Sequence, residues 1–257
     1  MEFGDIVRQI ERWVEDEAVK GAAITVEHHG EIVALHHAGE AREGVPVDED
    51  TLFALASVSK PFTAAAFMRV AEQGLISLDD AVTDVLHDFG HFDDPLAEGI
   101  NPRLEASRDD ITFRQLLAHT SGLPENLPRG SLDMSELPSM DHQVDLMLKT
   151  PLSTAPGERL RYSNLGPAIA ARAIEEVTGT GIHELIQHLV IDPMDLASGV
   201  VLTPRDDYDD RIATVQDPPN DGTPAESYNT RYWRDSGITW GGYFGTAKDT
   251  LRFATSF

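Results

Sequence analysis

Two hydrophobic patterns follow one another in the N-terminal part of the chain. Apolar residues recur at the spacing of one helix face in Val7, Ile10, Val14 and Ala18. This spacing predicts an amphipathic helix over residues 4–19. The next stretch, GAAITVEHHGEIVALHHAGEA, has two runs rich in β-forming residues on either side of His29, Gly30 and Glu31. We expect the two runs to form a β-hairpin.

The pattern changes at Ser57, after which alternating runs are almost absent and helical spacing dominates. Caps, glycines and prolines bound the predicted helices, which span residues 57–73, 79–87, 112–118, 141–149, 165–178, 181–190 and 246–256. Prolines, glycines and polar residues predict loops over 120–138 and 202–236.

These patterns divide the chain into two regions. Residues 1–56 form the helix and hairpin of an α/β region, and residues 57–257 form a mostly helical region. A two-stranded hairpin alone is only marginally stable in water. The hairpin therefore either packs on helices alone, or its partner strands are missing from this chain.

The net charge of the chain limits the kinds of molecule that it can be expected to bind. The 257 residues include 44 acidic and 20 basic ones, for a net charge of −24, and no cysteine. Such a surface repels nucleic acid and anionic membranes. The acidic residues are spread along the whole chain, which favours adaptation to high salt, where charge repulsion is strongly screened.

The N-terminus lacks the basic and apolar regions of a signal peptide, and no apolar run is long enough to span a membrane. We therefore predict a cytoplasmic protein.

The first candidate for chemistry is the pair Ser57 and Lys60. Residues three apart on a helix share one face, and a serine hydroxyl becomes a nucleophile when a neighbouring base takes its proton. A lysine can be that base when an apolar setting favours its neutral form, and apolar residues flank this pair. The alternative is that Ser57 caps the helix and Lys60 is solvated.

Two further stretches carry polar side chains suited to catalysis. Tyr162 can transfer protons when cations are near, and Asn164 can hold a substrate carbonyl from a loop that enters a helix. The alternative is that Tyr162 packs on the domain and Asn164 caps the helix.

His119 could belong to a Ser–His–Asp triad, in which an acidic residue orients the histidine. No acidic residue lies near it in a local pattern, so we interpret His119 as structural.

Metal binding has one weak candidate. His87 and His91 have the spacing of zinc ligands on a helix, with Asp88, Asp93 and Asp94 nearby. Because Gly90 separates the two histidines and Asp-Pro follows, we expect a helix end and a loop there. We predict neither a metal nor another cofactor.

Taken together, five stretches resemble one family. They are FALASVSKPFTAAA, GLISLDDAV, ITFRQLLAHTSGLP, PGERLRYSNLG and TWGGYFGTAKDTLRF. The chain resembles the penicillin-binding-protein and β-lactamase family, in the branch of class C β-lactamases, D-alanyl-D-alanine carboxypeptidases and related serine esterases. The resemblance implies an α/β (α+β) fold of the β-lactamase/transpeptidase type, with an antiparallel sheet flanked by helices and a mostly helical domain.

The resemblance also implies roles for the candidate residues. Ser57 would be the acylated nucleophile, and its backbone N–H would form half of an oxyanion hole. Lys60 and Tyr162 would share the general base and acid work. Asn164 would hold the substrate and orient Lys60. Residues 228–240 correspond to the mouth of the family's cleft.

One family motif, Lys/His-x-Gly on a later strand, has no match after Tyr162. His28-His29-Gly30 and His37-Ala38-Gly39 fit its spelling, but both precede Ser57, so we interpret them as turn and strand-end residues. We therefore expect that the chain ends before the C-terminal sheet strands. Loss of one oxyanion donor typically lowers kcat by about 10²–10³, and an exposed sheet edge could bind a complementing C-terminal segment.

Three functions remain open. The first is a serine hydrolase that acts through an acyl-enzyme on a small-molecule ester or amide, with esterase or peptidase activity favoured over β-lactamase activity. The second is a non-catalytic fragment or pseudoenzyme that binds a ligand or a complementing chain. The third is a metal-dependent hydrolase built on His87 and His91.

Overall fold

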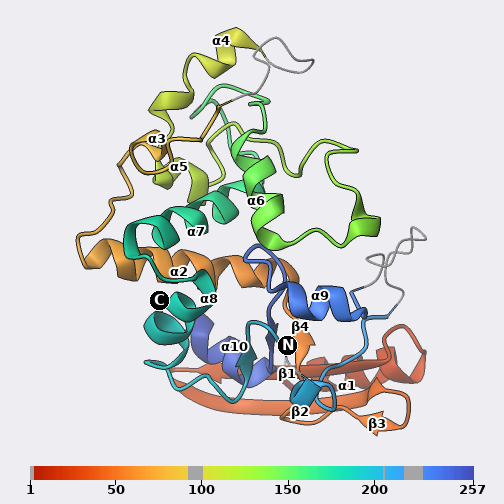
Figure 1. Cartoon of the computed structure of the whole chain (residues 1–257). Helices are drawn as coiled ribbons and strands as arrows, with labels where there is room; N and C mark the ends of the chain where they lie inside the picture. The colour runs from red at the N-terminus through yellow and green to blue at the C-terminus, as the bar shows by residue number, and fades with distance from the viewer. Residues whose placement is uncertain (1–2, 92–100, 205, 217–227) are drawn as a thin grey trace. The chain divides into compact units, whose positions relative to one another are not determined.

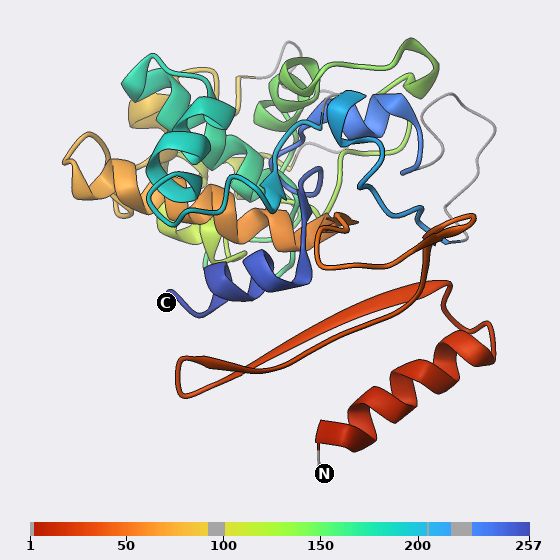
Figure 2. The same ribbon diagram turned by 90° about the horizontal axis from the view of Figure 1, so that it is seen from below.

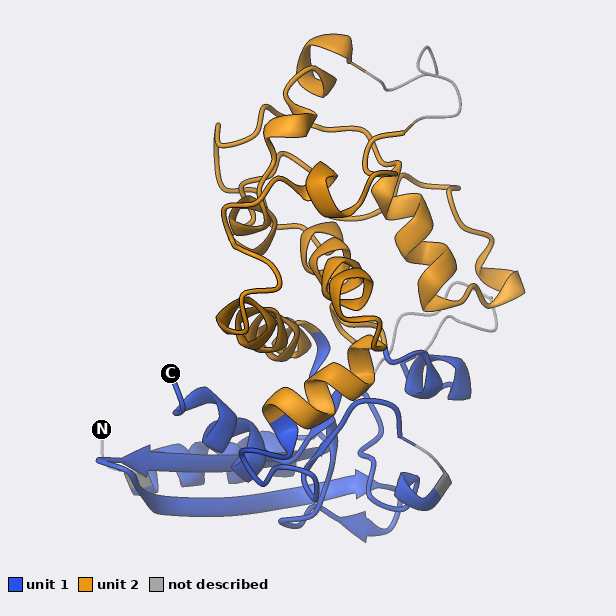
Figure 3. Cartoon of the chain, turned by 60° about the vertical axis from the view of Figure 1, so that its left-hand side comes forward, with its two compact units in different colours: residues 1–56, 191–237, 242–257 blue, residues 57–190, 238–241 orange. Residues whose placement is uncertain are grey.

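The computed structural model describes residues 3–91, 101–204, 206–216 and 228–257. Two compact units make up the chain (Figure 3). Unit 1 contains residues 1–56, 191–237 and 242–257, and unit 2 contains residues 57–190 and 238–241. Unit 1 is thus made of three chain segments, because most of the chain after Val190 returns to it.

The predicted hairpin is present in unit 1. Strands β1 (Gly21–His28) and β2 (Glu31–Arg42) pair antiparallel, and β3 (Val45–Pro46) adds a short third strand (Figure 1). The turn residues His29 and Gly30 both have positive φ, 54° and 83°, as the type I′ hairpin turn requires. His28-His29-Gly30 therefore forms the strand end and turn, as predicted.

The prediction for His37-Ala38-Gly39 was wrong, because these residues lie inside β2 and pair with β1. Gly39 is needed there because its φ is +71° and a Cβ would lie 2.1 Å from the carbonyl oxygen of Lys20.

Helix α1 (Phe3–Glu15) contacts both long strands, and α10 (Ala247–Ala254) contacts β1. Figure 2 shows the hairpin running between these two helices.

A second sheet in unit 1 explains why residues after Val190 return to it. Strand β6 (Phe244–Gly245) pairs with both β4 (Phe53–Ala54) and β5 (Val200–Val201). Their apolar cluster consists of Leu52, Val201, Ile212 and Phe244. Two-residue strands are too short to show alternation, so the sequence pattern missed them. It also missed α9 (Arg231–Ser236), which follows a polar, glycine- and proline-rich stretch.

Unit 2 is mostly helical. Its α-helices are α2 (Ser59–Glu72), α3 (Val82–Val85), α4 (Pro102–Glu105), α5 (Phe113–Leu117), α6 (Met140–Leu148), α7 (Leu165–Thr178) and α8 (Ile182–Ile186). Short 3₁₀ turns cover Ala56–Val58, Arg108–Asp110 and Met134–Glu136 in this part of the chain, and Asp206–Tyr208 in unit 1. Helix α3 is shorter than predicted because Ala81 is extended and bridges Thr112. A π-helical turn, Gln187–Ile191, continues from α8.

Helix α7 is the centre of unit 2. It contacts α2, α5, α6 and α8, and nine of its residues are buried. Its bounds are those predicted, and Gly179 ends it with φ +67°. Gly166 permits the close approach of α5, since a Cβ there would lie 2.5 Å from the carbonyl oxygen of Leu116.

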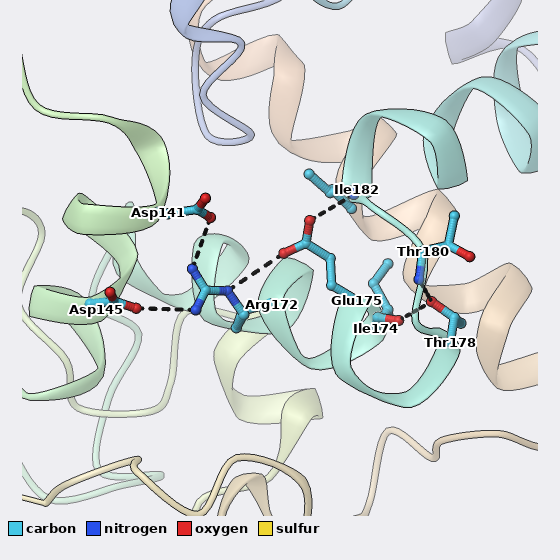
Figure 4. Close-up of polar contacts among 8 residues, drawn as sticks. All are labelled: Asp141, Asp145, Arg172, Ile174, Glu175, Thr178, Thr180 and Ile182. Atoms are coloured by element: carbon cyan, nitrogen blue, oxygen red, sulfur yellow. Dashed lines mark hydrogen bonds and ion pairs between the residues drawn. The ribbon is translucent and has the colours of Figure 1, made fainter.

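A charged network joins α7 to α6 and to the start of α8 (Figure 4). The Arg172 guanidinium lies 3.0 Å from Asp141, 3.1 Å from Asp145 and 3.5 Å from Glu175. Glu175 in turn accepts a 2.7 Å hydrogen bond from the backbone N–H of Ile182. Burial raises the pKa of Glu175, although that hydrogen bond and Arg172 oppose the rise.

The structure has the mixed helix and antiparallel-sheet composition that the sequence predicted. Among the described residues, none of the helices has the length and apolar character needed to cross a membrane.

Candidate active site

The site begins where the chain enters α2. Ser57 lies in the 3₁₀ turn Ala56–Val58, and the N-cap position belongs to Val58, which makes no side-chain cap hydrogen bond. Ser57 is therefore not the helix cap. The residue before it, Ala56, has a φ of +46°, a conformation unfavourable for a residue with a Cβ and frequent beside functional groups. The backbone thus holds an exposed serine at the positive end of a 14-residue helix.

Lys60 lies one turn further along α2 and is only 7% exposed. Its Nζ donates to Ser57 Oγ at 3.0 Å and to the carbonyl oxygen of Trp240 at 2.6 Å. A parallel contact comes from Thr63, whose hydroxyl donates to the Thr239 carbonyl oxygen at 3.0 Å. These bonds attach residues 239–240 to α2 and fix the direction of the lysine side chain.

Tyr162 completes the cluster from a distant part of the sequence. Its hydroxyl donates to Ser57 Oγ at 2.8 Å, and Lys60 Nζ lies 4.9 Å from the centre of its ring. Burial alone would raise the pKa of Tyr162, but hydrogen bonds with Lys60 and Ser57 and the lysine's charge lower it overall. Ser57 Oγ thus faces two groups that can exchange protons with it, and all three residues belong to unit 2.

Asn164 lies at the start of α7 but does not cap it with its side chain. Ser163 does so instead, because its Oγ accepts from the backbone N–H groups of Leu165 and Gly166. The Asn164 side chain donates to Asn126 Oδ1 at 2.7 Å. Among the hydrogen bonds of the described residues, none joins Asn164 to Lys60, so the implied orienting role is not seen in this geometry.

His119 lies beside the cluster rather than in a triad. Its ring stacks on Tyr162, with centroids 4.7 Å apart, and its Nδ1 accepts the backbone N–H of Ser163 at 3.2 Å. Burial, together with the charge of Lys60, holds the pKa of His119 below its usual value.

The candidate metal ligands are not grouped. His87 Nδ1 is 3.1 Å from the Thr83 carbonyl oxygen, and Asp93 and Asp94 lie outside the described residues. Within the described ranges, no three His, Asp or Glu side chains are arranged to hold a metal ion.

Comparison with protein families adds the deciding observation. The family model described as Beta-lactamase matches residues 6–256, nearly the whole chain. The chain belongs to the beta-lactamase family. This assignment confirms the resemblance seen in the five sequence stretches.

Individual members of the family show the same likeness. The chain is 34% identical over 191 residues to esterase EstB of Burkholderia gladioli, which covers 68% of this chain and 45% of the esterase. It is 30% identical over 170 residues to penicillin-binding protein 4* of Bacillus subtilis, which covers 64% of this chain and 34% of that protein. The chain thus spans less than half the length of these curated relatives.

Solved structures agree on the fold. The D-amino acid amidase of Ochrobactrum anthropi aligns with a TM-score of 0.75 and 21% identity, over 98% of this chain and 68% of the amidase. At this identity the likeness shows the beta-lactamase-type fold alone.

Two groups in this candidate site could not be predicted from the sequence. One is the Trp240 carbonyl that holds Lys60, and a backbone carbonyl leaves no signature in a sequence. The other is Asn126, which lies within the predicted loop 120–138 and pairs with Asn164. A polar side chain in such a loop is too common to single out.

Proposed function

We propose that this protein is a serine hydrolase that cleaves a small ester or amide through an acyl-enzyme on Ser57. One observation carries the proposal: Lys60 Nζ and Tyr162 Oη lie 3.0 and 2.8 Å from the same serine oxygen. That is the geometry of a nucleophile with proton-transfer groups in hydrogen-bonding reach. Membership of the beta-lactamase family supports the same chemistry.

Acylation would begin with attack of Ser57 Oγ on the substrate carbonyl carbon. The hydroxyl proton passes to whichever of Tyr162 and Lys60 is deprotonated, and the lowered pKa of Tyr162 favours the tyrosinate. The Ser57 backbone N–H, at the positive end of α2, is placed to stabilise the tetrahedral oxyanion. Collapse breaks the bond to the leaving oxygen or nitrogen, which takes the transferred proton.

Deacylation repeats the sequence with water. A water molecule attacks the acyl carbonyl carbon while the same base takes its proton, and that proton returns to Ser57 Oγ as the carboxylic acid leaves. The amide groups of Asn164 and Asn126 are candidates to hold the substrate, because they are hydrogen-bonded to each other and Asn164 lies two residues after Tyr162.

We favour an esterase or peptidase-like substrate over a β-lactam. The similarity to esterase EstB supports this choice, and the structural neighbour that is a D-amino acid amidase extends it to amides. The net charge of −24 supports function at high salt and argues against nucleic acid or anionic membranes as partners.

The test compares wild type with Ser57→Ala. Wild type should hydrolyse p-nitrophenyl acetate or butyrate, and should form a covalent adduct at Ser57 with a fluorophosphonate, detected by peptide mass spectrometry. Ser57→Ala should lose both. Turnover that survives in Ser57→Ala would contradict the proposal, and sensitivity of that turnover to chelators would point to a metal hydrolase. Nitrocefin hydrolysis faster than ester hydrolysis would reverse the substrate order.

The edge strand β1 supports a second function, which is the binding of a complementing strand. This strand pairs with β2 on one side, and none of the described strands pairs with its other side. Unpaired strand edges are templates for another chain. Sedimentation velocity over a range of concentrations tests the simplest case, in which the β1 edges of two copies pair with each other. That case predicts self-association, and a single monomeric species at all concentrations would contradict it.

A further inference from the structure

The segment that carries Tyr162 is held at three points by one residue, His119. The carbonyl oxygen of His119 accepts the Arg161 backbone N–H at 2.7 Å, and its Nδ1 accepts the Ser163 backbone N–H at 3.2 Å. Between these two bonds, the imidazole ring stacks on the Tyr162 ring at 4.7 Å and 40°. His119 therefore contacts the residue before Tyr162, Tyr162 itself and the residue after it.

The backbone of His119 has a left-handed conformation in which histidine is much less common than glycine. The Thr120 N–H bonds the Gln115 carbonyl oxygen, and the His119 N–H bonds that of Leu116, which together form a Schellman motif at the end of α5. His119 occupies the left-handed position of this motif, with φ +58°. Glycine is the usual residue there because it avoids the Cβ clash. A histidine at this position gives up the conformational freedom of glycine and supplies a side chain that contacts Tyr162 and Ser163 instead.

Tyr162 needs such support because the core does not hold it. The side chain is 39% exposed, so one part of the ring faces solvent while the His119 ring covers another. A ring displaced by 1 Å would lose the 2.8 Å hydrogen bond to Ser57 Oγ, and misplacements of this size can lower rates about 10²-fold.

The protonation state of His119 fits the contact. A backbone N–H only donates, so Nδ1 must accept and the imidazole must be neutral, with its proton on Nε2. Burial and the nearby Lys60 ammonium lower the pKa of His119, which keeps the acceptor available at neutral pH. Among the described residues, the charged or titratable ones that lie against His119 are Lys60 from α2 and two from the segment before α7. These two are Tyr162, which stacks on the ring, and Arg161, which bonds the His119 carbonyl oxygen through its backbone N–H.

We propose that His119 is a positioning residue that fixes the Tyr162 hydroxyl against Ser57. It acts through Tyr162 and does not touch the serine. The role in turnover rests on the proposed function, whereas the effect on the position of Tyr162 does not.

The decisive variant is His119→Gly. Glycine suits the left-handed position, which offsets part of the stability lost with the two side-chain contacts. The melting temperature of the variant should therefore fall by only a few degrees. We expect kcat for p-nitrophenyl acetate to fall roughly 10- to 100-fold with KM within about twofold. His119→Asn tolerates the left-handed backbone and keeps an acceptor oxygen, so it should recover part of kcat. His142→Asn, on the exposed start of α6, is the control and should match wild type.

A purely structural role predicts a different pattern, namely a lower melting temperature with unchanged kcat in the folded fraction. A folded His119→Gly protein that keeps kcat within about twofold would overturn the inference. These outcomes apply where wild-type turnover depends on Ser57.

Should wild type show no Ser57-dependent turnover, the proposed function fails, and a second readout decides on His119 alone. Titration of the Tyr162 ring carbon by NMR, assigned with Tyr162→Phe, should give a midpoint below the ordinary tyrosine value in wild type. In His119→Gly the displaced hydroxyl should lose the hydrogen bond to Ser57 that lowers its pKa, so the midpoint should move up towards the ordinary tyrosine value. An unchanged midpoint and line shape would overturn the inference.

Discussion

The two sides of the candidate site are built by different means. On the helix side, Ser57 lies in the 3₁₀ turn that leads into α2 and Lys60 in the first turn of α2, and this local geometry brings Nζ to 3.0 Å from Oγ. On the loop side, Tyr162 reaches the same oxygen from 105 residues away and depends on His119 for its place. The helix side therefore needs one well-formed helix, whereas the loop side needs the correct packing of α5 against α7.

The largest expected effect comes from the helix side, in Lys60→Met. The substitution keeps the length of the side chain but removes the ammonium that joins Ser57 Oγ to the Trp240 carbonyl. We expect kcat for ester hydrolysis to fall roughly 10³-fold, within the range of lost acid–base groups. Lys248→Met, on exposed α10 surface, is the matched control. A loss in Lys60→Met below about tenfold would mean that Tyr162 works without the lysine.

On the loop side, Tyr162→Phe removes the hydroxyl and keeps the ring that stacks on His119. We expect kcat to fall about 10²-fold. Because a base acts in its deprotonated form, wild-type kcat should rise with pH as Tyr162 ionises, with a midpoint below the ordinary tyrosine pKa of 10.0. The rise should be absent in Tyr162→Phe and present in Tyr208→Phe, a change at a tyrosine that packs on the apolar cluster of the second sheet. An identical pH profile in Tyr162→Phe would assign the base to another group.

The helix side is formed by residues close in sequence and the loop side by residues far apart, and this difference also determined which site residues could be predicted from the sequence. Ser57 and Lys60 are three residues apart, so helix periodicity alone placed them together. Tyr162 could be assigned only through its resemblance to a family, because no local pattern relates residues 105 apart. His119 was interpreted as structural because a triad was the only role considered for it, and its contacts with residues 161–163 depend on tertiary packing.

The fold shows the same limit. Helix α7 was predicted with correct bounds because its apolar residues, its start and Gly179 all agree. The strands β4, β5 and β6 were missed because two residues carry no period. Their pairing is what joins residues after Val190 to unit 1, and no periodic pattern in the sequence indicates it.

Gly166→Ala tests whether α5 and α7 must be close for the loop side to form. The added Cβ would lie 2.5 Å from the Leu116 carbonyl oxygen, so one helix must shift, at a cost of roughly 1–3 kcal/mol in unfolding free energy. Because α5 leads to His119 and α7 follows Tyr162, we expect kcat to fall about tenfold as well. Urea denaturation and ester turnover measure the two effects.

Gly181→Ala is the control for this substitution, because no atom lies within 4 Å of the Cβ position there and its φ is −64°. It should leave both stability and kcat near wild type. If Gly166→Ala lowers stability but leaves kcat unchanged, then the spacing of the two helices does not control the loop side.

The smallest effect is expected from Arg172→Gln, which leaves the site untouched and weakens only the α6–α7 network. Its partners Asp141 and Asp145 are largely exposed, with side chains 76% and 59% accessible, so we expect a loss of no more than about 1 kcal/mol at neutral pH and unchanged kcat. Glu175 adds a pH dependence. Its pKa is already raised by burial and Arg172 opposes that rise, so the substitution should raise it further.

A carboxyl with a raised folded-state pKa is most favourable while protonated, and its contribution to stability falls as pH rises through that pKa. The deficit of Arg172→Gln should therefore be greatest at neutral pH and shrink as pH falls towards the ordinary glutamate pKa of 4.5. Urea denaturation at several pH values measures it. A deficit independent of pH would show that Asp141 and Asp145 alone account for the network, and a change in kcat would mean that α6 also supports the loop side.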